Sequence, residues 1–154
     1  MEKKWWHHLT AYQIYTRSFC DSNGDGIGDF QGIISKLDYL QELGIGAIWI
    51  SPFNDSPNYD NGYDISDYYA ILKDFGTMAD LEEMIQECEK RDIIVMMDLV
   101  LNHCSHEHPW FLGACKDRNG KYHDIISGKK GRRISHRKDQ LLSLAEMCGS
   151  GFLR

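Results

Sequence analysis

A regular alternation between strand-like and helix-like stretches constrains the fold of this chain more than any other feature. Three short apolar runs, at residues 11–15, 46–51 and 93–101, are rich in β-branched and aromatic side chains, as β-strands are. The third run is apolar on both parities, which is typical of a strand buried on both faces. Two stretches with apolar residues at helical spacing, 30–43 and 78–88, separate these runs. The order predicts an α/β fold with parallel strands.

The helical stretches also carry signals for their ends. Gly44 directly follows the first stretch, where a glycine can adopt the left-handed conformation that often ends a helix. Thr77 and Asp80 precede the apolar face of the second stretch in the arrangement of a capping box. We therefore expect two helices that begin and end close to these residues.

Polar side chains gather where the predicted strands end. They are Asp98, Asn102 and His103 after the third strand, and Asp60, Tyr63 and Asp64 after the second. In a parallel barrel the loops at the carboxyl ends of the strands converge and carry the active site, so these residues are candidates for function. A carboxylate at a single strand end can equally do no more than cap a turn.

The stretch DSNGDGIGD, residues 21–29, has the pattern of a calcium-binding loop. Oxygen ligands recur at alternate positions, from the side chains of Asp21, Asn23, Asp25 and Asp29 and the carbonyl of Ile27. Gly26 stands where the sharp turn is needed, but Gly32 replaces the bidentate glutamate of an EF-hand. The alternative is a loop of Asx-turns without metal. We favour Ca²⁺, because closely spaced acids that shared no cation would repel one another.

Cysteine usage and charge bound the class of protein. The five cysteines are odd in number and scattered, which favours free thiols in a reducing compartment, so we expect a cytoplasmic protein. The N-terminus lacks the apolar core of a signal peptide, and no run approaches the roughly 18 apolar residues of a membrane span. Residues 1–124 hold 10 of the 17 basic and 21 of the 23 acidic residues. This balance argues against nucleic acid as a partner, and neither a membrane nor a specific protein partner is indicated.

Cys104, His106 and His108 lie close enough in sequence to raise the question of zinc. Structural zinc sites normally gather four ligands, often as two spaced pairs. The sequence offers no second pair, so we do not predict a zinc site.

Three blocks together resemble a known family. They are YQIYTRSFCDSNGDGIGDFQGIISKLDYLQELGIGAIWISP, SPNYDNGYDISDYYAI and MDLVLNHCSHEHPWF. In order and spacing they are similar to the start of the α-amylase superfamily of glycoside hydrolases (family 13), most of all to its oligo-1,6-glucosidase, α-glucosidase and trehalose-6-phosphate hydrolase group. The resemblance covers residues 5–124. Thr16 stands where this group usually has proline, and Cys104 where it usually has threonine.

The resemblance implies a fold and a set of sugar-binding residues. The fold would be the first three β/α units of a TIM (β/α)8 barrel, incomplete in this chain. Asp60 would hydrogen-bond hydroxyls of the non-reducing-end glucose, Tyr63 would stack on that ring, and His103 would bond its 6-hydroxyl. Asp98 would orient neighbouring groups on the barrel rim. The loop at 21–29 would be a structural Ca²⁺ site.

The resemblance also implies an oligosaccharide substrate with terminal α-linked glucose, hydrolysed with retention of configuration. Retaining glycosidases need two carboxylates about 5–5.5 Å apart. In this family the nucleophile follows the fourth strand and the acid/base the fifth, whereas the predicted strands here number three. We therefore expect no catalytic residue in this chain and no turnover by it. The alternative is a non-catalytic sugar- or metal-binding remnant.

Residues 125–154 differ from the rest, with seven basic and two acidic residues. Members of the group continue after the equivalent of residue 124 with Tyr-Tyr-Ile-Trp and later with Ser-Phe-Phe-Gly-Gly. Back-translation with suitable synonymous codons, read one base earlier, yields both stretches from residues 124–130 and 141–150. We therefore predict a domain boundary at 124 and a frameshifted, disordered tail at 125–154. The alternative is a basic-tailed interaction module.

Overall fold

The computed structural model describes residues 4–117 and 119–126. The chain forms two compact units. The first consists of Met1–Phe53 and Ala70–Leu99, and the second of Asn54–Tyr69 and Val100–Arg154.

A three-stranded parallel sheet forms the centre of the first unit. Its strands are β1 (Ala11–Ile14), β2 (Ala47–Ile50) and β5 (Ile94–Met97), in the order β1-β2-β5. Ala11 pairs with Ala47 in one ladder, and Ala47 pairs with Ile94 in the other. The predicted α/β fold with parallel strands is confirmed. The third strand is shorter than the predicted 93–101, because the ladder with β2 ends at Met97.

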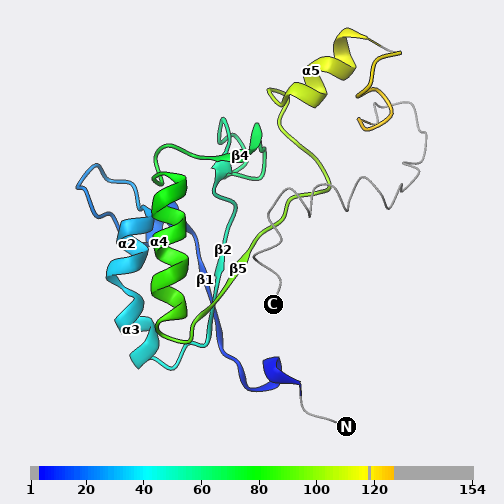
Figure 1. The fold of residues 1–154 in the computed structure, drawn as a ribbon. Coiled ribbons are helices and arrows are strands. Elements are labelled where there is room, and N and C mark those ends of the chain that lie inside the picture. Colours follow the sequence, from blue (N-terminus) through cyan, green and yellow to red (C-terminus); the bar gives the residue numbers. More distant parts are fainter. Residues whose placement is uncertain (1–3, 118, 127–154) are drawn as a thin grey trace. The chain divides into compact units, whose positions relative to one another are not determined.

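Helices cover one side of this sheet (Figure 1). They are α2 (Phe30–Ser35), α3 (Leu37–Glu42) and α4 (Met78–Glu89). Ile14, Ile48 and Ile50 on the sheet are fully buried in one cluster with Ile33, Leu37, Leu40, Met84 and Cys88 from the helices. Burying a side chain of this size contributes about 1.5–3 kcal/mol, so this layer is the main source of stability in the first unit.

The predicted helix over 30–43 is two helices, with a break at Lys36. The Ser35 hydroxyl donates to the carbonyl of Gly32 at 2.7 Å, which competes with the regular helical bond. The Lys36 amide then bonds to Ile33, three residues back, and Lys36 has φ −110° and ψ 2°. The apolar period continues through the break, so periodicity alone did not reveal it.

The predicted helix ends are confirmed. Gly44 has φ 79°, its amide donates to the Gln41 carbonyl, and the Ile45 amide donates to Leu40, which together make a Schellman motif. At the start of α4 the Thr77 hydroxyl accepts from the Asp80 amide while the Asp80 carboxylate accepts from the Thr77 amide. This reciprocal pair is the capping box.

Short elements complete the first unit. A 3₁₀ turn η1 (Trp5–His8) precedes β1, and a single helical turn α1 (Thr16–Phe19) follows it. Thr16 is buried, and its hydroxyl has no hydrogen-bond partner among the described protein atoms.

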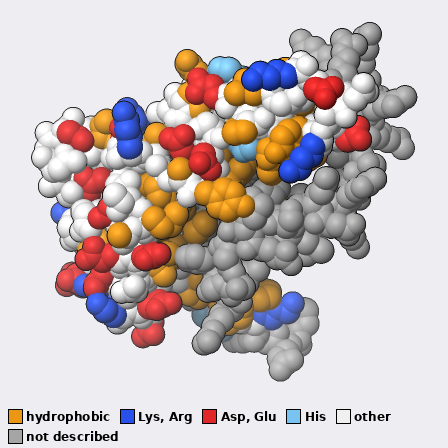
Figure 2. All heavy atoms as spheres, turned by 45° about the horizontal axis from the view of Figure 1, so that its top comes forward, with side chains coloured by type: hydrophobic (Ala, Val, Ile, Leu, Met, Phe, Trp, Pro, Cys, Tyr) orange, Lys and Arg blue, Asp and Glu red, His pale blue; other side chains and the backbone are white. Residues whose placement is uncertain are grey.

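The left-hand part of Figure 2, where α2, α3 and α4 lie, carries many acidic side chains and few basic ones. This distribution agrees with the acidic balance of residues 1–124.

In the second unit, the described residues form a two-stranded sheet and one helix. The strands are β3 (Asn54–Asp55) and β4 (Asp67–Ile71), whose last two residues belong to the first unit, and the helix is α5 (Pro109–Lys116). His108 caps α5, because its Nδ1 accepts from the Trp110 amide at 3.1 Å. Four aromatic rings form a row of contacts here: Tyr68 packs against His108, His108 against Trp110, and Trp110 against Tyr122.

Three predictions lie partly outside the described residues. Most of the predicted tail, residues 127–154, is not described, so its disorder and the boundary at 124 stay predictions. The four cysteines among the described residues, Cys20, Cys88, Cys104 and Cys115, are free. Within the same part of the chain, no helix has the length and apolar character needed to cross a bilayer.

The end of α4 offers a test of the helix-capping geometry. Asp92 has φ 56°, and the Ile93 amide bonds back to the Cys88 carbonyl at 3.0 Å. A side chain in this left-handed conformation costs about 1 kcal/mol, which glycine avoids. We expect Asp92→Gly to raise the free energy of unfolding by about 0.5–1 kcal/mol, measured by urea denaturation. Asp92→Ala is the matched control and should lower it; equal effects of both variants would contradict the assigned geometry.

Candidate sugar-binding and calcium sites

A tight turn in the second unit carries two of the predicted sugar-binding residues. Asp60 and Tyr63 are its first and last residues, and the Tyr63 amide donates to the Asp60 carbonyl at 3.0 Å. The central residues Asn61 and Gly62 have φ 53° and 94°, the values of a type I′ turn. Asn-Gly is the residue pair that this turn favours, because both positions need a positive φ. The turn therefore fixes the spacing between the Asp60 and Tyr63 backbones.

Asp64 holds this turn from within. Its Oδ1 accepts from the Ser56 hydroxyl at 2.8 Å and the Asp60 amide at 3.2 Å, and its Oδ2 accepts from the Tyr59 amide at 2.9 Å. Burial of the carboxylate raises its pKa, but the hydrogen bonds from Ser56, Asp60 and Tyr59 outweigh burial, so the pKa of Asp64 is lowered. The carboxylate is thus held ionised where it ties three points of the loop together.

The segment that bears His103 belongs to the same unit. The Tyr68 hydroxyl donates to the Val100 carbonyl at 2.7 Å and lies 3.1 Å from the His103 carbonyl. The Ser105 amide donates to the Ile65 carbonyl at 2.8 Å. These bonds join residues 65–68 to residues 100–105, so the structure brings the Asp60–Tyr63 turn and His103 into one compact unit. Asp60 and His103 are exposed and Tyr63 is partly buried.

Asp98 lies in the first unit, directly after β5. Its amide donates to the Ile50 carbonyl at 3.2 Å, which continues the parallel hydrogen-bonding pattern one residue past the strand. At the same end of the sheet, Gln13 Nε2 lies 3.3 Å from the Ser51 hydroxyl. Of the predicted polar residues, Asp98 is therefore the one that directly follows a strand of this sheet.

The loop at 21–29 is organised by its own side-chain oxygens. Asp21 Oδ1 accepts from the amides of Asn23 and Gly24, and Oδ2 accepts from Gly26 at 2.8 Å. Asn23 accepts from the Asp25 amide and Asp25 from the Ile27 amide, both at 2.8 Å. The amide of Gly26, followed by that of Gly24, lowers the pKa of Asp21. These are successive Asx-turns, the geometry of the alternative without metal, and they also favour the ionised form of Asp21.

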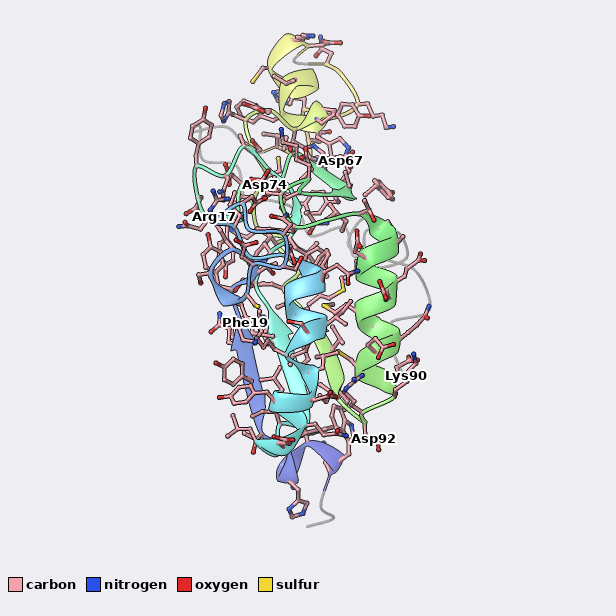
Figure 3. The ribbon with its side chains drawn as sticks, turned by 90° about the vertical axis from the view of Figure 1, so that its left-hand side faces the viewer. Arg17, Phe19, Asp67, Asp74, Lys90 and Asp92 are labelled. Carbon is pink, nitrogen blue, oxygen red and sulfur yellow. The ribbon has the colours of Figure 1, made fainter. Side chains whose placement is uncertain are left out.

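Glycines seat this loop against the turn after β1. An added Cβ at Gly28 would meet the Thr16 carbonyl oxygen at 2.0 Å, and one at Gly32 would meet the Cys20 carbonyl oxygen at 1.9 Å. The amides of Gly28 and Asp29 donate to Arg17 and Cys20. Nearby, Arg17 pairs with Asp74 at 3.6 Å (Figure 3). The backbone of the loop is therefore fixed in place.

Two of the five predicted calcium ligands differ in how available their oxygens are. Asp29 is buried, and its oxygens accept from the Ser22 amide and hydroxyl and from the Gly32 amide at 2.6 Å, which caps α2. Asp25 is exposed at the loop tip. No cluster of three His, Cys, Asp or Glu side chains suited to a metal occurs among residues 4–117 and 119–126. A calcium ion here would therefore depend on the side-chain oxygen of Asn23 and the carbonyl of Ile27, in addition to the carboxylates of Asp21 and Asp25.

The residues considered for zinc serve other contacts. The His106 ring lies against Tyr59, with centroids 5.8 Å apart. His108 is buried as the cap of α5, and its pKa is lowered by burial, although Asp67 acts in the opposite direction. Burial also raises the pKa of the Cys104 thiol. A zinc ligand thiol would have to be a thiolate, which this environment disfavours.

Asp64 and Tyr68 are the residues whose roles sequence reasoning missed. The sequence indicates Asp64 only as one of the polar residues after the second strand, and it predicts no role for Tyr68. The sequence holds one signal for Asp64, because an Asp that follows Asn-Gly by two residues can reach back to the amides that enter the turn. Nothing local indicates Tyr68, whose partners are 32 and 35 residues away.

Comparison with known proteins gives one family and many relatives. Residues 13–143 match the model of the alpha amylase catalytic domain. The chain is 58% identical over 132 residues to oligo-1,6-glucosidase from Bacillus cereus, and 58% over 124 residues to glucan 1,6-alpha-glucosidase from Streptococcus pneumoniae. The crystal structure of trehalose-6-phosphate hydrolase from Bacillus licheniformis matches with 52% identity and a TM-score of 0.77.

These matches cover most of this chain and a small part of each relative. They span 86%, 80% and 79% of the chain, but only 24%, 23% and 22% of the three relatives in the same order. The parallel sheet with helices on one side agrees with the N-terminal part of a TIM barrel, as predicted. The family match reaches residue 143, which is 19 residues beyond the predicted boundary at 124.

The lowered pKa of Asp64 predicts a pH-dependent contribution to stability. A carboxyl whose folded pKa lies below its ordinary 3.8 stabilises the fold above pH 3.8, and this stabilisation is lost as the pH falls through the folded value. Asp64→Asn should lower the free energy of unfolding by about 1 kcal/mol at pH 7. The difference from the native chain should shrink below pH 4, measured by denaturant unfolding. Glu107→Gln is the control; a difference that stays constant with pH would contradict the role of Asp64.

Proposed function

The chain belongs to the α-amylase family and is by family a glycoside hydrolase of the α-glucosidase type, and from this premise we propose that it supplies the glucose-binding part of such an enzyme. The substrate would be an oligosaccharide with a terminal α-linked glucose. We place α-1,6-linked glucose first, because two of the quoted relatives are named for that linkage. Other linkages remain outcomes of the assay below.

The turn from Asp60 to Tyr63 carries this proposal. An aromatic ring offers a flat apolar face that complements the C–H face of a sugar, while a neighbouring carboxylate accepts hydrogen bonds from its hydroxyls. The type I′ turn sets the two groups three residues apart on a short rigid segment, and Asp64 holds that segment at three amide or hydroxyl donors. Such rigidity lowers the entropic cost of binding.

His103 would complete the contacts to the same sugar. Its ring can donate or accept a hydrogen bond, which suits the 6-hydroxyl. The Tyr68 hydroxyl, which lies 3.1 Å from the His103 carbonyl, supports the backbone of this histidine. Asp98, in the first unit, would orient neighbouring groups on the rim of the barrel, as the family resemblance implies.

Bond cleavage would need groups beyond those assigned to this chain. Retention requires a nucleophile and an acid/base about 5–5.5 Å apart. The family places them after strands four and five, and the parallel sheet among the described residues has three strands. The residues of this chain would therefore bind and orient the glucose. We further infer a cytoplasmic location from the free thiols, with no nucleic acid, membrane or specific protein as partner of the sugar site.

We predict glucose binding without turnover. Titration of the isotope-labelled chain with millimolar isomaltose should shift the NMR signals of Tyr63 and His103. Tyr63→Ala should abolish the shifts at His103, because the stacking surface is removed. Tyr59→Ala is the matched control, since Tyr59 lies in the same loop and is 77% exposed. Shifts that persist in Tyr63→Ala would contradict the assigned site.

The same preparations test catalysis. Isomaltose, maltose, trehalose-6-phosphate and p-nitrophenyl α-glucoside should release no glucose or nitrophenol with the native chain alone. Glucose release that disappears in Tyr63→Ala would overturn the prediction that this chain is inactive by itself.

We also propose that Ca²⁺ binds the loop at 21–29 through Asp21, Asn23, Asp25 and the Ile27 carbonyl, with Asp29 fixing the loop to α2. The ion would neutralise the loop acids and act structurally. Binding to the folded state alone stabilises by about 2.7 kcal/mol at a hundredfold excess over Kd. Millimolar Ca²⁺ should raise the melting temperature, and Asp25→Ala should remove the gain. Glu42→Ala on α3 should keep it; no shift in the native chain would argue against the site.

A further inference from the structure

The segment from His103 to His108 is anchored at Ser105. This serine is 2% exposed, its amide donates to the Ile65 carbonyl at 2.8 Å, and its hydroxyl accepts from the Glu107 amide at 3.1 Å. The His108 amide donates back to the Ser105 carbonyl at 3.1 Å. His103 and His108 are therefore the two ends of one short folded segment, and His103 is the end assigned to the sugar.

The His108 ring holds the other end of this segment in its neutral form. Its Nδ1 accepts from the Trp110 amide at 3.1 Å, which leaves the proton of the neutral ring on Nε2. His108 is 5% exposed and lies at the start of α5, where the helix dipole disfavours a positive charge. Burial lowers the pKa of His108, and the Asp67 carboxylate opposes this shift. A proton on Nδ1 would break the cap and place a charge where burial disfavours it.

The same ring packs against the residue that supports His103. Its centroid lies 5.5 Å from that of Tyr68 and 4.7 Å from that of Trp110, and the centroids of these two rings are 6.2 Å apart. The Tyr68 hydroxyl donates to the Val100 carbonyl at 2.7 Å and lies 3.1 Å from the His103 carbonyl. Two routes thus connect the His108 ring to His103, one along the folded segment and one through Tyr68.

We propose that His108 is a positioning residue for the sugar site, whose neutral ring holds the segment with His103 in place and whose protonation releases it. The release would develop as the pH falls below 6.5, the ordinary pKa of histidine, because the released ring takes up a proton there while the held ring resists it. The consequence for sugar binding rests on the proposed function, whereas the release of the segment does not.

Other titratable groups lie on the elements packed against His108. They are Asp67 and Tyr68 on β4, Glu107 and the exposed His103 and His106 in the folded segment, Cys115 and Lys116 on α5, and Lys121 and Tyr122 beside Trp110. Of these, Asp67 acts on the pKa of His108, and it favours the protonated ring (Figure 3). His103 and His106 are imidazoles too, so the experiment has to separate their protonation from that of His108.

Hydrogen exchange of the isotope-labelled 154-residue chain tests the release without any sugar. Protection factors, which correct for the intrinsic pH dependence of exchange, are compared at pH 7.5 and pH 5.5. At the Ser105 and Trp110 amides we expect a fall of about threefold or more, since linkage allows about tenfold per pH unit below the ordinary pKa. The Ser66 amide, which donates to the Asp55 carbonyl at 2.8 Å in the same unit, should keep its protection. An equal fall at Ser66 would overturn the proposal, because the whole unit would then unfold.

A conservative variant separates the histidines. His108→Asn keeps a neutral acceptor for the Trp110 amide, since asparagine is a favoured N-cap and does not titrate. It should remove the pH dependence at Ser105, whereas the matched control His106→Asn should retain it. In the native chain the imidazole signals of His108 should follow the same pH profile as the Ser105 protection, so the outcome does not depend on the variant alone. A fall that persists in His108→Asn, or that follows the signals of His103 or His106 instead, would contradict the positioning role.

Isomaltose titrations connect the release to the sugar site. Apparent affinity falls in proportion to the fraction of chains in which the segment is still held. Between pH 7.5 and pH 5.5 the weakening should be about threefold larger for the native chain than for His108→Asn, because both chains contain His103. Equal weakening in the two chains would overturn the proposal. No binding by either chain at either pH, together with the expected exchange result, supports the release of the segment and contradicts the proposed function.

Discussion

The first unit depends on the burial of one face of a parallel sheet beneath α2 and α4. Ile14, Ile48 and Ile50 come from two neighbouring strands and are fully excluded from water by side chains such as Ile33 and Met84. Parallel strands cannot be joined by tight hairpins, so each crossover must pass over the sheet. The helices that make these crossovers are the same ones that cover the isoleucines. The same helices therefore both connect the strands and cover the core. The right-handed crossover rule leaves little freedom in the topology.

Function in this chain is assigned to segments that lie outside that core. The loop at 21–29 and the loop around Asp60 are both shaped by carboxylates that accept from backbone amides. In both loops the hydrogen bonds that the carboxylate accepts lower its pKa, as for Asp21 and Asp64. Such loops are stiff although they bury few apolar groups. This is the property that a sugar or metal site needs, because the ligand then meets groups already in place.

The two faces of the sheet differ as the outer and inner faces of a barrel sheet do. The face beneath the helices is closed and dry, while the face with Trp49 and Met96 is open. Its exposure would be an aggregation risk for an isolated parallel sheet.

The sequence by itself determined the local features, because each depends on neighbours within a few residues. The alternation of periods indicated the parallel sheet, Gly44 and the Thr77–Asp80 pair marked helix ends, and Asn61-Gly62 contained the signal for the type I′ turn. Tertiary structure decided what depends on distant partners. The role of Tyr68 depends on carbonyls more than 30 residues away. The break at Lys36 has a local cause, the bond from the Ser35 hydroxyl to the Gly32 carbonyl, but a continuous apolar period hides it in the sequence. The assignment of Asp98 to one unit and of Asp60, Tyr63 and His103 to another is likewise invisible in the sequence, because it reflects which segments pack together and not what each prefers alone.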